Sequence, residues 1–285
     1  MKFWAMIGFR AFALAISVCP AIAQVKSGTV IFGQFTSTDI VLAADSGFIA
    51  VGGNGIVTHG AGQCKIGAFN GKILFAIAGV LNFNGRNGQK IWNLLDQARG
   101  AAAGTEISSL ADLRDLADRW VERVHPLVEE AIRANPQLKD YTSNGSVVSV
   151  ALFSSRDIGG NIISYITFIE LIPGASKEPF TSVKTFSPAQ ISERAHFAVP
   201  IAVGHGSEIW QELETGASRR AKASSGLARR VRHSKSVADM ERATMDLTLL
   251  AEKWVPDHAG GAIDQVHLGP TGVEWLHRKQ NCAGN

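Results

Sequence analysis

Residues 28–46 read GTVIFGQFTSTDIVLAADS, two apolar runs joined by a short polar segment. The first run, 30–35, and the second, 40–44, are rich in the β-branched and aromatic residues that favour strands. The polar residues 36–39 between them are typical of a turn, so this stretch predicts a β-hairpin. Because the second run is apolar at every position, we expect that strand to be covered on both faces.

The rest of the chain alternates blocks of strands with blocks of helices. The pair Asn70-Gly71 predicts a turn between short strands at 65–66 and 72–78. Expected helices cover 84–99, 109–124, 127–134 after a kink or restart at Pro126, 207–213 and 236–254. Ser207 is expected to cap the helix that it begins, and Ser236 and Asp239 are expected to form a capping box in the last helix. Later expected strands cover 147–153, 162–171, 197–203, 262–268 and 273–276. This order favours an α+β fold, a four-layer αββα sandwich with helices packed outside two stacked antiparallel sheets.

The first 23 residues have the three-part layout of a cleavable secretory signal. Their apolar core, 11–19, is shorter than the roughly 20 residues of a spanning helix, and the AIA sequence that ends the segment suits signal peptidase. We therefore expect an exported protein, periplasmic or extracellular, with no stable membrane insertion after signal cleavage. The alternative is an uncleaved membrane anchor. The expected division is a signal at 1–23, a short leader at 24–28, one domain at 29–278 and a C-terminal tail at 279–285.

Composition excludes several classes of function. Hydrophobic residues make up 46% of the chain, which suits a domain with a sizeable core, and the net charge of +3 is too small to predict a nucleic-acid partner. There is no phosphate-binding loop, dinucleotide fingerprint or metal-ligand spacing, so we expect no cofactor and no metal. Two cysteines follow the signal, Cys64 and Cys282, and they are equally compatible with a disulfide and with free thiols.

Four residues stand out together: Thr29, Asp45, Lys65 and Gly79. Asp45 follows Thr29 by 16 positions, Lys65 precedes an isoleucine after a short loop, and Gly79 follows an alanine one hairpin further on. This arrangement resembles the opening of proteasome β-type subunits, members of the N-terminal-nucleophile (Ntn) hydrolase family. The loop before Lys65 is a few residues longer than in that family.

The resemblance implies a role for each residue. Self-cleavage of the Gly28–Thr29 bond would expose Thr29 as the nucleophile, with its own α-amino group as the base. A cationic Lys65 would lower the proton affinity of that amine and hydroxyl, and Asp45 would hold the lysine in place. The backbone N–H of Gly79 would donate to the oxyanion. The implied reaction is amide hydrolysis through an ester on Thr29.

The resemblance continues towards the C-terminus, with departures. The sequence VGHG at 203–206 resembles the family's Gly-Ser-Gly turn, and DHAGGAID at 257–264 resembles its Asp and Gly-Gly segment. His205 and Ala259 stand where the family has serines, and Val30 stands where it has a threonine. The chain therefore lacks hydroxyl groups that the family uses to handle protons.

Two further candidate residues come from the same segments. Asp257 is expected as an orienting carboxylate, as the resemblance implies. His205 suggests an alternative, a Thr29–His205–Asp257 relay, since histidine is the usual base near neutral pH. The other interpretation of His205 is a histidine satisfied by local backbone.

The sequence thus predicts an exported, self-processing threonine amidohydrolase or peptidase that acts on peptides or small amides. The alternative is a noncatalytic, proteasome-like binding or assembly subunit, in which Asp45 and Lys65 form an ordinary ion pair. A homo-oligomer is compatible with both. The stretch 219–235 is basic and contains no acid. We expect a solvated loop there, and binding of an anionic partner is the alternative.

Overall fold

The computed structural model describes residues 24–28, 30–52, 57–84, 90–141, 146–158, 161–172, 180–186 and 197–282. Their strands form two antiparallel sheets. The larger sheet contains β1 (Gln24–Gly28), β4 (Phe48–Gly52), β5 (Val57–Gly60), β6 (Ile66–Phe69), β7 (Ile73–Asn84), β8 (Lys90–Asn93), β9 (Val148–Ile158), β10 (Asn161–Ile172) and β11 (Phe180–Phe186). The smaller sheet contains β2 (Val30–Phe35), β3 (Ile40–Ala44), β12 (Val199–Gly204), β13 (Asp264–Gly269) and β14 (Gly272–His277).

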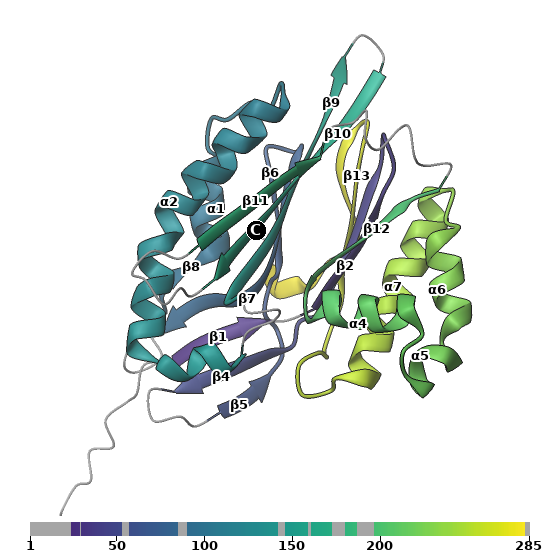
Figure 1. Cartoon of the computed structure of the whole chain (residues 1–285). Helices are drawn as coiled ribbons and strands as arrows, with labels where there is room; N and C mark the ends of the chain where they lie inside the picture. The colour runs from purple at the N-terminus through teal and green to yellow at the C-terminus, as the bar shows by residue number, and fades with distance from the viewer. Residues whose placement is uncertain are drawn as a thin grey trace, which may run out of the picture.

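Helices cover the outer face of each sheet (Figure 1). Those beside the larger sheet are α1 (Leu94–Ala102) and α2 (Leu110–Ala134), and those beside the smaller sheet are α4 (His205–Thr215), α5 (Arg219–Ala223), α6 (Ser225–Arg232) and α7 (Val237–Trp254). Two short 3-10 helices, η2 (Pro136–Tyr141) and η3 (Gln280–Cys282), complete the described elements. The chain is therefore α+β with antiparallel sheets, as the sequence predicts.

Three hydrophobic clusters fix the order of these layers. One lies between the sheets and joins residues such as Leu42 and Val266 of the smaller sheet to Ala76 and Phe153 of the larger one. A second packs the other face of the larger sheet against α1 and α2, around the fully buried Trp120. A third packs β2 against α4, α6 and α7. Burial of apolar surface on both faces of both sheets is compatible with the expected four-layer sandwich.

The hairpin at the start of the chain is confirmed. β2 and β3 pair directly, and the Thr36 N–H donates to the Asp39 carbonyl across the turn at 2.8 Å. All five residues of β3 are buried, as expected for a strand covered on both faces. The second turn is also confirmed, because Asn70 and Gly71 adopt the left-handed conformation between β6 and β7.

The segment expected as a leader is an interior strand of the larger sheet. β1 pairs with β4 on one edge and with β7 on the other, over all five of its residues. The C-terminal segment is also packed onto the body, since Lys279 is 7% exposed and Cys282 is fully buried. Both ends of the described chain thus belong to the folded unit.

Two expected helices have different bounds. The helix expected at 84–99 begins only at Leu94, because Lys90–Asn93 pairs with β7 and the Asn93 side chain caps the helix by accepting from the Leu95 and Asp96 N–H groups. The restart of the helix at Pro126, one of the two expected outcomes, is wrong, since α2 continues through this residue to Ala134. The stripe of apolar residues on both sides of Pro126 packs on the sheet and holds the two halves in one helix.

The last helices show one confirmation and two corrections. Ser236 and Asp239 form the expected capping box of α7. Ser207 does not cap α4, which already begins at His205; the Ser207 hydroxyl donates to the Ala202 carbonyl instead. The basic stretch is not a loop, because its apolar residues pack towards α7 and form α5 and α6. No helix in the described ranges is long and apolar enough to cross a bilayer.

One surface ion pair should make stability depend on pH. His267 on β13 is 2.8 Å from the Asp39 carboxylate; this contact raises the pKa of His267 and lowers that of Asp39. Stabilisation by the raised histidine is complete below its ordinary pKa of 6.5 and is lost as pH rises through the folded value. Stabilisation by the lowered carboxyl is complete above 3.8 and is lost as pH falls through its folded value.

We expect the pair to contribute about 1 kcal/mol to the free energy of unfolding between those limits, and less on either side. The measurement is urea unfolding of wild type, His267→Asn, Asp39→Asn and the double variant at several pH values. A coupling energy that stays constant across the whole pH range would contradict the assignment.

Candidate functional site

Strand pairing brings the ends of several strands together around position 29. Gly28 at the end of β1 lies opposite Gly79 on β7, and Val30 at the start of β2 lies opposite Gly204 at the end of β12. Thr29 lies outside the described residues. It is the one residue between a strand of the larger sheet and a strand of the smaller sheet.

The register of β7 relates Lys65 to the Gly28–Thr29 bond. The Ile77 N–H donates to the Lys65 carbonyl at 2.8 Å, while Gly79 lies opposite Gly28. Both contacts lie on the same edge of β7, because β9 pairs with the other edge from Ile73 to Gly79. Two residues along a strand span about 7 Å, so along β7 the Lys65 backbone lies about that far from the position opposite Gly28, the residue before the expected cleavage site.

Asp45 and Lys65 form a buried ion pair. The Lys65 ammonium contacts the Asp45 Oδ1, and both side chains are 0% exposed. The other carboxylate oxygen accepts from the N–H groups of Gly47 and Gly260, each at 2.9 Å. Burial lowers the pKa of Lys65, and the Asp45 charge opposes that shift. The arrangement is a cation held by a carboxylate that two backbone donors fix in place.

Gly79 occupies a position that only glycine fits. Its φ is +92°, and a Cβ there would collide with the Val147 carbonyl oxygen. The next residue, Val80, donates its N–H to that same carbonyl at 2.8 Å. The backbone of β7 thus departs from regular strand geometry where Gly28 pairs with it.

His205 lies beside the same end of the sheet, directly after Gly204. Its Nδ1 is 2.9 Å from the Glu208 carboxylate, and its ring lies 4.6 Å from that of His258 between centroids. Burial first, and the charge of His205 second, lower the pKa of His258. The carboxylate paired with His205 is therefore Glu208, whereas the relay alternative expects Asp257.

Asp257 lies in an exposed turn after α7. Its carbonyl contacts His59 Nδ1 at 2.8 Å. The loop that it begins reaches the buried ion pair three residues later, through the Gly260 N–H. The contact between this loop and Asp45 is thus made by the Gly260 backbone N–H and not by the Asp257 carboxylate.

The structure adds two residues that the sequence did not single out. The Ser46 hydroxyl is buried beside Asp45 and has no hydrogen-bond partner among the described residues. Glu252 on α7 has its pKa raised, by burial first and by the Asp45 charge second. Ser46 could have been noticed as the hydroxyl next to Asp45, but Glu252 carries no local signal because α7 brings it there from a distant part of the chain.

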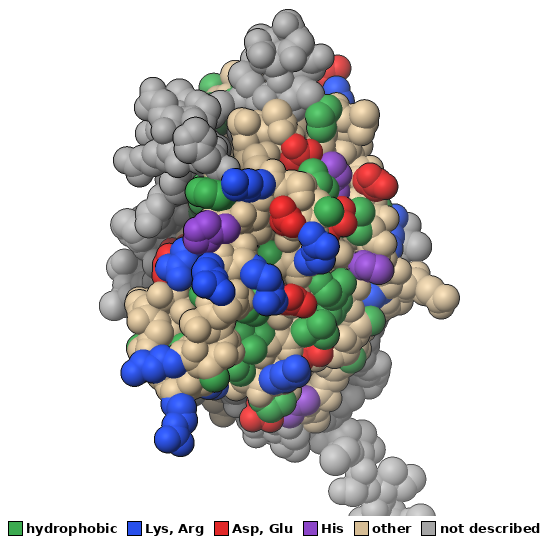
Figure 2. Space-filling view, turned by 90° about the vertical axis from the view of Figure 1, so that its right-hand side faces the viewer, with side chains coloured by type: hydrophobic (Ala, Val, Ile, Leu, Met, Phe, Trp, Pro, Cys, Tyr) green, Lys and Arg blue, Asp and Glu red, His purple; other side chains and the backbone are tan. Residues whose placement is uncertain are grey.

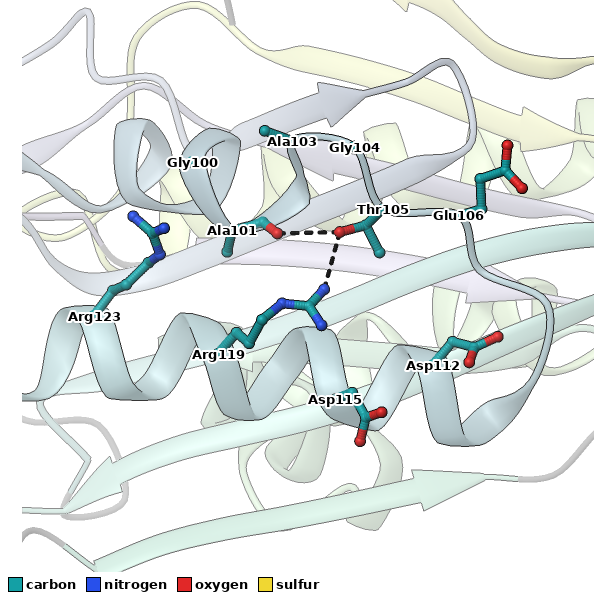
Figure 3. Close-up of a pocket in the computed structure, with 10 residues that line it drawn as sticks. All are labelled: Gly100, Ala101, Ala103, Gly104, Thr105, Glu106, Asp112, Asp115, Arg119 and Arg123. Atoms are coloured by element: carbon teal, nitrogen blue, oxygen red, sulfur yellow. Dashed lines mark hydrogen bonds between the residues drawn. The ribbon is translucent and has the colours of Figure 1, made fainter.

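Two hollows on the described residues lie away from this site. A groove of about 420 Å³ lies between the end of α1 and the start of α2, where Thr105 donates to the Ala101 carbonyl and accepts from Arg119 (Figure 3). Its lining mixes arginines with acidic side chains. A neighbouring groove of about 590 Å³ is lined by Ile73, the first residue of β7. Ile73 and Gly79 are the two ends of the part of β7 that pairs with β9. Neither groove contains a residue of the candidate site.

The basic helices α5 and α6 lie on one face of the molecule, where acidic side chains lie among some of the Lys and Arg side chains (Figure 2). Arg220 pairs with Glu212 at 2.6 Å, and Arg230 pairs with Asp246 at 2.7 Å. Neighbouring acids thus offset part of the basic stretch. Within the described ranges, no group of three or more His, Cys, Asp or Glu side chains could hold a metal ion.

No protein-family model matches this chain, and a search of curated proteins finds no match.

Proposed function

We propose that this chain has the Ntn-hydrolase fold and is an exported, self-processing N-terminal threonine amidohydrolase or peptidase. The observation that carries the proposal is the pairing of β1. It sets Gly28 opposite Gly79, on the same edge of β7 that receives Lys65, whose ammonium is buried against Asp45. A backbone donor, a buried cation and a peptide bond that precedes a threonine are the parts that such a self-cleavage needs.

The proposed reaction uses the chain's own groups. The Thr29 hydroxyl attacks the Gly28 carbonyl carbon and its proton passes to the departing Thr29 nitrogen, which leaves Gly28 as an ester on the Thr29 oxygen. This shift frees the Thr29 amine, and water then hydrolyses the ester to a Gly28 carboxyl group and the restored Thr29 hydroxyl. Lys65 stabilises negative charge on the hydroxyl oxygen, and the Gly79 N–H donates to the developing oxyanion. The new amine serves as the base for later substrates.

The substrate class follows from the position of β1. Because β1 pairs with β4 and β7 through its backbone, another extended chain could make the same contacts after β1 leaves. Peptides are therefore our favoured substrates, and small amides are the alternative. No cofactor is proposed, because the amine, the hydroxyl and the backbone donor suffice for amide hydrolysis.

Export is proposed from the signal-like residues 1–23, and the disulfide supports it. The sequence does not decide whether Cys64 and Cys282 are paired. In the structure they form a disulfide with a Cα–Cα distance of 5.7 Å. Disulfides form and persist mainly in oxidising compartments such as the periplasm or the extracellular space.

The second candidate is a noncatalytic binding or assembly subunit. It is favoured by the full pairing of β1 on both edges, which gives an uncut chain a complete sheet. His205 and Ala259 at the family's serine positions point the same way. Under this proposal the Asp45–Lys65 pair is structural.

A Thr29→Ala variant separates the two proposals. We expect the exported wild-type protein to begin at Thr29 and the variant to begin at Gln24, because alanine has no hydroxyl to attack the Gly28 carbonyl. Intact mass and N-terminal sequencing measure both starts. Thr29→Ser, which keeps a hydroxyl, should still be cleaved, and Thr36→Ala in the β2–β3 turn is a matched control that should begin at residue 29. A wild-type start at Gln24 would favour the noncatalytic subunit, and a variant that still begins at residue 29 would assign the cleavage to another protease.

A further inference from the structure

The loop that leads into Lys65 is held by the C-terminal segment. Residues 61–65 have no regular secondary structure. Three consecutive residues of this loop are each contacted from the segment Lys279–Cys282: Asn281 Nδ2 donates to the Gly62 carbonyl at 2.5 Å, Lys279 Nζ donates to the Gln63 carbonyl at 3.1 Å, and Cys282 forms the disulfide with Cys64.

The segment is itself anchored to the smaller sheet. Lys279 Nζ is 2.8 Å from Asp264 Oδ2, and the Lys279 N–H donates to Asp264 Oδ1 at 2.7 Å. Asp264 is the first residue of β13 and is 0% exposed. The Arg278 guanidinium donates to the Cys282 carbonyl at 2.9 Å and so closes the segment on itself. The contacts of the loop are therefore made to a fixed part of the fold.

The same loop reaches the candidate site. The Gln63 N–H donates to the Ser46 carbonyl at 3.0 Å, one residue after Asp45. The Lys65 carbonyl then accepts from Ile77 on β7. A shift of the loop would move the backbone from which the buried Lys65 side chain extends, because only Cys64 separates Lys65 from Gln63.

We propose that Lys279–Cys282 is a clamp that positions Lys65, with the disulfide as its covalent lock and Lys279 as a positioning residue. The proposal that the positioned site cleaves Gly28–Thr29 rests on the proposed function, whereas the clamp itself rests on the contacts above. The clamp holds the loop 61–65 of the same chain.

The charges around Lys65 give the clamp a second effect. Among the described residues these are Asp45, which contacts the ammonium, and Lys279. Asp264 pairs with Lys279, and the Asp45 charge acts on Glu252 and raises its pKa, after burial. Burial makes the largest contribution to the lowered pKa of Lys65, and the charge of Lys279 lowers it further. Loss of that charge should let Lys65 stay protonated to higher pH.

Hydrogen exchange tests the clamp without reference to activity. In Cys64→Ala/Cys282→Ala we expect the Gln63 and Ile77 amides to exchange about 10-fold faster or more, because the Gln63 amide and the Lys65 carbonyl that accepts from Ile77 both belong to the released loop. The Met240 amide, which is bonded within the start of α7 to Ser236, is the control and should not change. Equal exchange of the Gln63 amide in wild type and variant overturns the clamp.

Two further proteins, Asn281→Ala and reduced wild type, test the clamp if the double alanine variant does not fold. Asn281→Ala keeps the disulfide and should speed exchange at Gly62–Gln63 alone. In wild type, dithiothreitol gives two electrons and two protons to the disulfide, which yields two thiols and oxidised, cyclic dithiothreitol. We expect the reduced protein to show the same local increase as the double alanine variant, and protection that survives both treatments contradicts the proposal.

Lys279 is tested by the pH profile of self-cleavage in the full-length chain. Lys279→Met should slow cleavage about 10-fold and move the alkaline limb of the profile to higher pH, as expected for a lost cation near Lys65. Lys279→Arg keeps the charge and should keep the limb in place. Uniform slowing at every pH in both variants would show a merely structural role and overturn the assignment. If wild type does not cleave itself, the proposed function fails, and the exchange measurements alone decide the clamp.

Discussion

Asp45→Asn is expected to lose about 3–5 kcal/mol of unfolding free energy, because it leaves the buried Lys65 ammonium without its counter-charge. Lys65 is 0% exposed, and Asp45 is the acceptor described for its ammonium. The carboxylate also accepts from Gly47 and Gly260, so the substitution weakens three contacts at once. Urea unfolding at pH 7 measures the loss. Asp246→Asn, in an exposed ion pair with Arg230, is the matched control and should cost about 0.5 kcal/mol or less.

A second substitution separates stability from catalysis. Asp45→Asn/Lys65→Met removes both charges and should recover part of the loss, since no buried ammonium remains. Under the proposed function this double variant begins at Gln24 although it is more stable than Asp45→Asn, because it lacks the Lys65 ammonium needed for self-cleavage. An Asp45→Asn variant that is no less stable than its surface control would show that the pair is not buried.

The pH dependence of Asp45→Asn has a definite sign. Removal of the carboxylate deepens the depression of the Lys65 pKa, which burial already causes. A lysine with a lowered folded pKa contributes full stability above its ordinary value of 10.5, and that stability is lost as pH falls through the folded value. The variant should therefore regain stability relative to wild type as pH rises from 7 towards 10.

Gly79→Ala is expected to destabilise the protein by about 3 kcal/mol or more. Two costs add at this position: a positive φ of +92°, and a Cβ that collides with the Val147 carbonyl oxygen. That carbonyl accepts from the Val80 N–H, so it cannot move away without loss of a strand contact. Thermal unfolding and urea unfolding both measure the effect.

Gly71→Ala is the matched control for backbone strain. Gly71 also has a positive φ, +66°, but nothing lies within 4 Å of a Cβ there. Its replacement should cost only the strain, about 1 kcal/mol. The difference between the two variants measures the collision at Gly79. Equal losses would mean that β7 adjusts to the side chain and that the close approach to Val147 is not required.

The hairpin at 30–44 and the cap of α7 were predictable because both depend on neighbours in sequence. Two apolar runs with a polar turn between them have few other ways to bury their side chains, and Ser236 and Asp239 satisfy backbone N–H groups within one helical turn. The bounds of α1 were not predictable. Lys90–Asn93 has a helical pattern, and pairing with β7 made it a strand.

The candidate site also combines residues that the sequence could predict with partners that it could not. Asp45, Lys65 and Gly79 could be proposed from the resemblance to proteasome β-type subunits, and their strand context was predictable from the apolar runs around them. The backbone partner of Asp45 was not predictable, since the Gly260 N–H comes from a position 215 residues away. The Glu208 partner of His205 lies only three residues along α4, yet it required a helix that begins two residues earlier than expected.

The sequence by itself determined elements such as the hairpin at 30–44 and the helix α7, because local hydrophobic patterns and capping act over a few residues. It also indicated which residues are candidates for chemistry. Only the tertiary structure decided that Gln24–Gly28 is an interior strand, that Cys64 joins Cys282, and that Lys279–Cys282 holds the loop before Lys65. These contacts join distant segments, and they form only when two sheets stack and bury the side chains between them.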